Sequence, residues 1–321
     1  MSKKYLFSDL TVGTNGAFQP NATEFFSKAL LGDNRSTNSF RTLVNVKNKT
    51  RIGSVEFGSV LSASSPTFAA NGVADVASKE FTVIPLNIGT EIDQYTLESS
   101  FVSQWMRAGS NQIDFGPAQF MTHYYERLAA KVSDSLEYLT WIGNTGGTGS
   151  GYTGANAYLT LADGLEKQLK AANEASALAV ASPTTITASN VIDELGKVIT
   201  KLPAALKYRK NDVVIKVAAD VAQLYELAAS KINTNTTVTQ SLGLVFQGYK
   251  IEVAPGMTSG KMVASLATNF VFVTDLVGDP AEIITLNMKE QTGDRTIRTI
   301  SDIKWCVGYI NPAEIVTYNF G

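Results

Sequence analysis

The chain has 321 residues, of which 44% are hydrophobic and 17% are charged, and its formal net charge is −2. This length exceeds one domain of roughly 100–150 residues and predicts two lobes, or one core with long extensions. The near-neutral charge excludes a whole-chain electrostatic preference for nucleic acid, membrane or an acidic substrate. Because ordinary soluble domains are about 25% charged, the low charged fraction indicates a surface that largely contacts other protein.

One cysteine, Cys306, excludes an internal disulfide framework and suits a reducing compartment. We expect it to be a small, buried apolar residue. The first 13 residues contain two lysines without a following apolar stretch, and no window is apolar enough to span a membrane. We therefore expect neither a secretory signal nor a membrane partner, and a product made in the cytosol.

Residues 1–45 alternate short apolar clusters with small polar residues, and only residues 22–31 have helical spacing. Residues 1–51 hold eight basic and three acidic residues, a net charge of +5. This segment is predicted to be an extended basic arm. It is either a solvated tail or a contact for an acidic neighbouring surface or for DNA.

Residues 50–59 and 79–93 both alternate apolar and polar side chains, which is typical of half-buried strands. A small, polar segment separates them, so residues 46–92 are predicted to form one long hairpin. An isolated two-stranded ribbon is marginally stable in water. The hairpin therefore needs a partner surface, and another subunit is the expected one.

Residues 117–142 have the strongest helical pattern, with Pro117 at the start and Gly143 just past the end. Apolar residues recur every three or four positions, from Met121 to Leu139. At 1.5 Å per residue the helix is about 39 Å long. It would serve as a structural spine.

The remaining sequence predicts an α+β lobe followed by a meander of strands. The lobe comprises helices at 187–204 and 219–229 and strands at 213–218, 248–255 and 269–275. Three further strands between residues 282 and 320 are expected to pair antiparallel beside the long helix.

Residues that could support catalysis are sparse. His123 is the only histidine and lies on the long helix, where a surface or interface role is expected. One cysteine and one histidine exclude zinc of the Cys/His type. Gly149, Gly151 and Gly154 match G-x-G-x-x-G, but they follow a helix and enter polar coil, which indicates a flexible loop. The phosphate-binding G-x-x-x-x-G-K-[ST] motif is absent.

Two pairs of acids lie close together in the sequence, Glu290 with Asp294 and Asp275 with Asp279. Their turn-rich surroundings favour solvated charges over an acid/base pair, which needs burial to separate the two pKa values. An oxygen-ligated calcium ion remains an open alternative there. We therefore predict no catalytic residue, no cofactor and no defined metal site.

The order of these elements resembles the major capsid proteins of tailed bacteriophages, the Hong Kong 97-type fold that encapsulin shells share. The similarity spans nearly the whole chain and rests on order and local pattern. Three passages carry it most clearly: ALKYRKNDVVIKVAADVAQLYELA at 205–228, FQGYKIEVAPGM at 246–257 and NFVFVTDLVGDPAEIITLNMKE at 269–290.

This resemblance implies an α+β capsid fold divided into an arm, an extended loop and two domains. The implied boundaries are 1–45 for the N-terminal arm, 46–92 for the extended loop, 93–184 with 281–321 for a peripheral domain containing the spine helix 117–142, and 185–280 for an axial domain.

The resemblance also implies a structural function without enzymatic activity. Copies would form the hexamers and pentamers of an icosahedral head that encloses double-stranded DNA in a virion assembled in the host cytoplasm. Each extended loop would lie over the spine helix of a neighbour. The implied partners are a separate scaffolding protein, since a long N-terminal scaffolding extension is missing, a portal and a decoration protein.

Two groups of candidate contact residues follow from this implied arrangement. The candidates for contact between subunits are Phe57, Phe68, Phe81, Arg127 and Lys131. The candidates for contact with DNA or the inner face of the shell are Lys3, Lys4, Lys28, Arg35 and Arg41.

Two alternatives remain open at this point. The first is an encapsulin-like compartment shell, which would contain a cargo enzyme in place of DNA. The second is a soluble two-lobe enzyme or binding protein, which would remain a monomer or small oligomer and have a polar site between its lobes.

Overall fold

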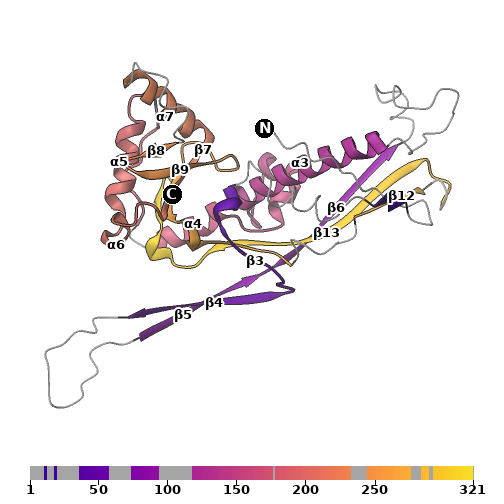
Figure 1. Cartoon of the computed structure of the whole chain (residues 1–321), viewed down its shortest axis with the longest axis horizontal. Coiled ribbons are helices and arrows are strands. Elements are labelled where there is room, and N and C mark those ends of the chain that lie inside the picture. The colour runs from indigo at the N-terminus through magenta and orange to yellow at the C-terminus, as the bar shows by residue number, and fades with distance from the viewer. Residues whose placement is uncertain are drawn as a thin grey trace, which may run out of the picture.

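The computed structural model describes residues 11–12, 18–19, 36–57, 74–93, 118–175, 178–232, 244–275, 283–288 and 292–320. A long body contains helix α3 running beside strands β6 and β13 (Figure 1). A lobe with α5, α7 and strands β7 to β9 lies at one end, and the hairpin β4–β5 projects from the body. The helix predicted at 22–31 lies outside the described residues.

Seven of the described strands form the sheet that runs along the body. Their order is β1-β2-β12-β13-β11-β3, and β6 also pairs with β13. Their bounds are β1 Thr11–Val12, β2 Phe18–Gln19, β3 Arg41–Leu43, β6 Ile84–Asp93, β11 Phe270–Val273, β12 Ile284–Asn287 and β13 Thr296–Tyr309. β13 is antiparallel to β6, β11 and β12, whereas β3 is parallel to β11.

Helix α3 spans Ala118–Ile142, close to the range that its apolar spacing predicts. It packs on the body sheet, where alternate residues of β13 such as Ile297 and Trp305 are buried. The Tyr125 hydroxyl donates a 2.7 Å hydrogen bond to Thr285 on β12. Burial raises the pKa of Tyr125, so this phenol is neutral and serves as a donor.

Short helices follow α3 and cover its C-terminal half. They are η3 (Ser150–Tyr152), η4 (Gly154–Thr160) and α4 (Leu165–Ala175). Gly149 and Gly154 have positive φ angles, 92° and 60°, which explains why glycine occupies these two turns. The glycines of the G-x-G-x-x-G spacing cap η3, lie within it and begin η4, so the segment predicted as a flexible loop instead contains two 3-10 helices.

The lobe at the end of the body contains a second sheet of five strands, in the order β14-β10-β7-β9-β8. Every residue of the central strand β7 is buried. The strands are β7 Val213–Ala218, β8 Val245–Phe246, β9 Tyr249–Ala254, β10 Met262–Leu266 and β14 Val316–Tyr318. The helices of the lobe are α5 Val191–Lys201, α6 Ala204–Lys207 and α7 Ala219–Ile232. One hydrophobic cluster, which includes Trp141, Val217 and Trp305, joins this lobe to the body.

The hairpin consists of β4 (Lys49–Phe57) and β5 (Ala74–Thr82), paired antiparallel along nine residues each. The prediction that residues 79–93 form a single return strand is wrong. Strand β6 begins at Ile84 and pairs with β13 over its full length. Its alternating apolar residues, such as Leu86, pack toward α3, and alternation alone does not reveal which partner covers a strand.

Two strands lie in a different sheet from the predicted one. β11 was expected in the α+β lobe but joins the body sheet, between β13 and β3. β14 was expected in the C-terminal meander but pairs with β10 of the lobe, after a turn at Pro312–Glu314. The meander is therefore reduced to β12 and β13. The division of the chain into an arm, a loop, a peripheral domain and an axial domain stays a prediction.

Candidate assembly interface

One face of the hairpin is exposed along its whole described length. It comprises alternate residues of β4 and the residues opposite them on β5. Near the body, Glu80 accepts hydrogen bonds from Lys49 at 2.7 Å and Arg51 at 2.8 Å. The hydrogen bond from Lys49, then that from Arg51, lowers the pKa of Glu80. This cross-strand ion cluster favours the observed register.

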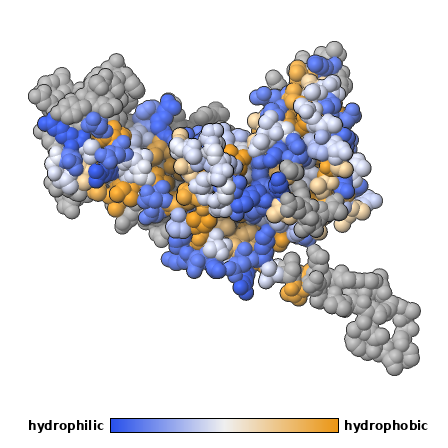
Figure 2. Space-filling view, turned by 180° about the vertical axis from the view of Figure 1, so that it is seen from behind, coloured by the Kyte–Doolittle hydropathy of each residue, from blue (hydrophilic) through white to orange (hydrophobic). Residues whose placement is uncertain are grey.

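Farther from the body, the same face presents an apolar pair. Val55 and Val76 lie directly opposite each other and are 54% and 69% exposed. Figure 2 shows apolar surface on the described part of the projecting hairpin. Directly opposite side chains on two strands lie side by side, so these valines form one continuous apolar spot. Nothing in the described part of the chain covers it.

The opposite face of the hairpin docks on the body at its root. Phe81 is 3% exposed and packs with Val83, Val271 and Val273. A Cβ atom at Gly308 would lie 2.7 Å from the Phe81 ring, so a larger residue there would displace this ring. The prediction that Phe81 contacts another subunit is therefore corrected. Its side chain is covered by strands β11 and β13 of its own chain.

Lys79 lies beside Phe81 at this root. Its ammonium nitrogen is 3.2 Å from the centroid of the Tyr309 ring, a cation–π contact. Burial lowers the pKa of Lys79 to about 8. Burial also raises the pKa of the Cys306 thiol to about 11, which keeps the thiol protonated. Cys306 is half-buried against the cluster around Phe81, close to the expectation of a small apolar residue.

A mostly apolar groove lies between β6 and α3. Its volume is about 260 Å³. Leu86 and Ile88 contribute from the strand, Leu128 and Val132 from the helix, and Leu161 is 51% exposed beside them. The groove is thus a second apolar surface available to a partner, on a different part of the molecule from the valine pair.

Two of the candidate contact residues lie on α3 near this groove. Lys131 is exposed and lines the groove, and Arg127 is exposed one turn earlier. Both positions leave the side chains accessible to a neighbour. Their contact with another subunit stays a prediction.

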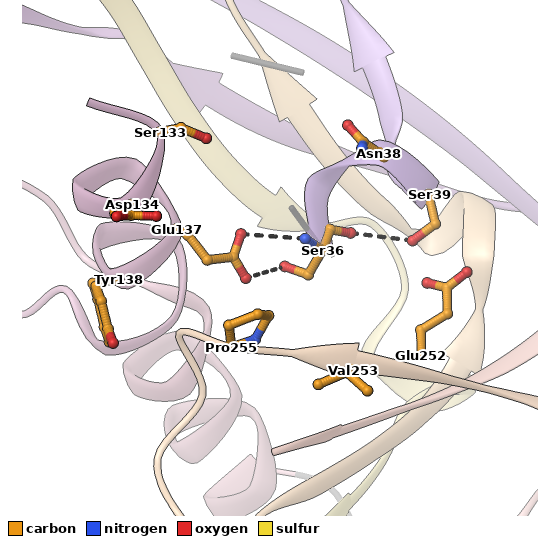
Figure 3. Close-up of a pocket in the computed structure, with 10 residues that line it drawn as sticks. All are labelled: Ser36, Asn38, Ser39, Ser133, Asp134, Glu137, Tyr138, Glu252, Val253 and Pro255. Atoms are coloured by element: carbon orange, nitrogen blue, oxygen red, sulfur yellow. Dashed lines mark hydrogen bonds between the residues drawn. The ribbon is translucent and has the colours of Figure 1, made fainter. Parts of the chain in front are cut away.

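A larger cavity of about 680 Å³ lies where the body meets the lobe (Figure 3). It is lined by the 3-10 helix η1 (Ser36–Ser39), by α3 and by the end of β9. Glu137 and Ser36 face each other across its wall, and Glu252 points toward Ser39 (Figure 3). The Ser36 hydroxyl donates to Glu137, and the Ser39 hydroxyl donates to the Ser36 carbonyl, so the cavity wall is a structural junction.

The other predicted contact residues lie at strand ends or outside the described part of the chain. Phe57 ends β4, and its backbone pairs with Ala74, but its side chain lies outside the described part. Arg41 begins β3 and is exposed, and its contact with DNA or the shell interior stays a prediction. The remaining candidates lie outside the described residues: Lys3, Lys4, Lys28, Arg35 and Phe68.

The exposed valine pair of the hairpin was not singled out from the sequence. The alternation of residues 50–59 includes Val55. Phenylalanines were chosen as the predicted contacts between subunits because large aromatic side chains dominate interfaces. The exposed face could have been identified from the alternation of side chains along each strand. Counting outward from the buried Phe81 in steps of two gives one face, and Val76 lies on the other.

The structure describes one acid of each predicted pair, and only one of the two is solvated as expected. Asp275 is 8% exposed and lies 3.0 Å from the ammonium of Lys304, so the prediction of a solvated charge is wrong there. Asp275 lies just after β11, a strand of the body sheet whose residues are all buried. Asp294 is exposed, as predicted, whereas Asp279 and Glu290 lie outside the described part.

His123 is exposed on α3, where its helical spacing places it. Within the described ranges, His, Cys, Asp and Glu side chains form no cluster of three that could hold a metal ion. Of the helices that the structure describes, none is both long and apolar enough to cross a membrane.

No protein-family model and no curated protein sequence matches the chain. Solved structures of capsids do match it. A chain of the satellite phage P4 procapsid aligns with a TM-score of 0.55 and 11% identity, over 88% of this chain and 92% of that one. A capsid chain of the native GTA particle gives 0.55 and 14%, over 88% and 90%. One from the Myoviridae phage XM1 gives 0.53 and 13%, over 87% and 89%. The chain therefore has the α+β fold of phage capsid proteins, which confirms the predicted fold class.

Proposed function

We propose that this chain is a structural shell subunit. Its copies form hexamers and pentamers of an icosahedral head that encloses double-stranded DNA. The observation that carries the proposal is the projecting hairpin, whose outer face presents Val55 and Val76 with no cover from the described part of its own chain. A ribbon that is marginal alone and carries an apolar pair on its exposed, described face is suited to pairing with a neighbour.

The groove between β6 and α3 is the surface that we assign to the neighbour's hairpin. Its walls are mostly apolar, and exposed Leu161 widens this apolar surface. The hairpin and the groove are different patches on one subunit, so the contact is heterologous, and it generates closed rings where the rotation between subunits closes. Each contact is small, but a subunit in a closed shell makes several at once.

The DNA-enclosing part of the proposal is supported by charge. Residues 1–51 carry a net charge of +5, and the rest of the chain carries −7, since the total is −2. A basic segment on the inner side of a shell would neutralise phosphates without reading their sequence. The remaining proposed partners are a separate scaffolding protein, a portal and a decoration protein, with assembly in the host cytoplasm.

Replacing both valines by aspartate tests the hairpin contact. Val55→Asp with Val76→Asp places two like charges opposite each other on an exposed face. We expect a folded subunit whose shells, tubes and capsomers are lost in negative-stain images and in sedimentation. The matched control is Val55→Ile with Val76→Ile, which keeps the apolar spot and should still assemble. Normal particles from the aspartate variant would refute the role of this face.

The contents of purified particles separate the DNA-filled head from a compartment shell of the same fold. Nuclease-resistant DNA of uniform length supports the head. A co-purifying enzyme in particles without DNA would overturn that part of the proposal. A chain that stays a single subunit at every concentration, with scaffold present, would overturn the shell function itself.

A further inference from the structure

A short strap, Ser36–Phe40, lies between α3 and the five-stranded sheet. On the side of α3, the carboxylate of Glu137 accepts hydrogen bonds from the Ser36 hydroxyl at 2.7 Å and from its backbone N–H at 3.2 Å. The indole N–H of Trp141 donates to the Ser36 hydroxyl at 2.7 Å. The Phe40 ring packs against Trp141, with centroids 6.5 Å apart.

On the side of the sheet, the strap is held by one lysine. Lys216 on β7 is 1% exposed, and its ammonium donates to the Ser36 carbonyl at 3.2 Å and to the Ser39 hydroxyl. Its third hydrogen bond goes to Glu252 on β9 at 2.7 Å. An ammonium has three N–H donors, so Lys216 is fully satisfied only while the strap is docked.

The strap contributes only neutral groups to this junction: hydroxyls, one N–H, one carbonyl and the Phe40 ring. The charged groups around it belong to α3 and the sheet: Glu137 and Lys216 are buried, and Glu252 pairs with Lys216 and with the exposed Lys250. A neutral strap can leave without carrying a buried charge into water. Its departure leaves Glu137 and Lys216 short of partners.

The strap is joined to the hairpin through strand β3 and the short segment after it. Strand β3 follows Phe40, and the backbone N–H groups of Asn45 and Val46 donate to the carbonyls of Asp275 and Thr274, at 2.7 and 3.3 Å. Strand β4 then begins at Lys49. The position of the hairpin's first strand is therefore tied, through a short continuous run of chain, to the buried junction.

We infer that the strap Ser36–Phe40 is a conformational lock: docked, it fixes the direction of the hairpin relative to the body and lobe, and undocked, it lets the hairpin reorient. Lys216 is the positioning residue that holds the lock closed. The device operates within one chain, so it goes beyond the proposed assembly function and is measured on the unassembled subunit.

The test combines hydrogen exchange with a distance measurement on the full-length chain. Spin labels at Val76→Cys on the hairpin and Lys201→Cys on α5, in a Cys306→Ser background, report the hairpin's direction by electron–electron resonance. Lys216→Met removes the ammonium. We expect amides of residues 36–46 to exchange at least about tenfold faster and the distance distribution to broaden or shift.

The matched control is Lys250→Met, because Lys250 also pairs with Glu252, at 2.8 Å, yet is 66% exposed and does not touch the strap. It should change neither readout. Ser39→Ala, which deletes one strap acceptor of Lys216, provides a milder variant should Lys216→Met fail to fold. Faster strap exchange with an unchanged distance distribution would overturn the coupling. Unchanged exchange would overturn the assignment of Lys216, and an equal effect of Lys250→Met would overturn the role of the strap contacts.

Discussion

Replacing Phe81 by alanine asks whether this side chain stabilises its own chain or a contact between subunits. Phe81 is 3% exposed, and its ring fills the space in front of Gly308. Truncating a buried phenylalanine typically lowers the free energy of unfolding by about 3–5 kcal/mol, because apolar area is lost and a cavity remains. We expect the lower half of this range, since the root cluster is small and can partly collapse.

The assay is chemical denaturation of the unassembled subunit, with hydrogen exchange to locate the loss. Exchange should accelerate in residues 79–83 and in β11, because Phe81 packs against Val271 and Val273. Val76→Ala is the control, since a 69% exposed side chain should change the stability by no more than about 0.5 kcal/mol. Unchanged stability of Phe81→Ala together with lost assembly would refute the intramolecular assignment.

Two further predictions concern backbone packing and pH. Gly256→Ala should destabilise the subunit by about 1–3 kcal/mol in chemical denaturation, because its Cβ atom would lie 2.4 Å from the carbonyl oxygen of Glu137. Gly196→Ala, inside α5 with nothing near its Cβ atom, should instead stabilise it by roughly 0.5–1 kcal/mol. The pKa of Lys79 is lowered to about 8 in the folded chain, so the unfolded chain binds more protons above that pH. The Lys79 contribution to stability should therefore rise between about pH 8 and 10.5, which thermal unfolding detects as a difference from Lys79→Met.

Each of these two predictions has a result that would contradict it. Equal stabilities of the Gly256 and Gly196 variants would mean that the loop after β9 yields easily and does not pack tightly on α3. A Lys79→Met variant that follows the wild-type stability at every pH would mean that the ring of Tyr309 fully offsets the burial of the ammonium.

Local elements were largely determined by sequence pattern. The apolar spacing and the bordering Pro117 and Gly143 predict a helix at 117–142, and α3 spans Ala118–Ile142. The run VVIKVA at 213–218 coincides with β7. These elements depend on side chains a few residues apart, so their signal lies in a short window of sequence.

Partner choice was decided by the tertiary structure. Alternation in residues 79–93 indicates strand, but only long-range pairing separates β5 from β6 and moves β14 into the lobe. Period-two spacing indicates which side of a strand is apolar, but it does not indicate which element covers that side.

The buried junction was equally hidden from sequence. Ser36 meets Glu137 from 101 residues away and Lys216 from 180 residues away. Nothing in the sequence around Lys216, Ser36 and Ser39 indicates that these residues contact one another. Burial and hydrogen bonding give them a common role only after the sheets and α3 have packed, since a charged group is buried only where its partners converge.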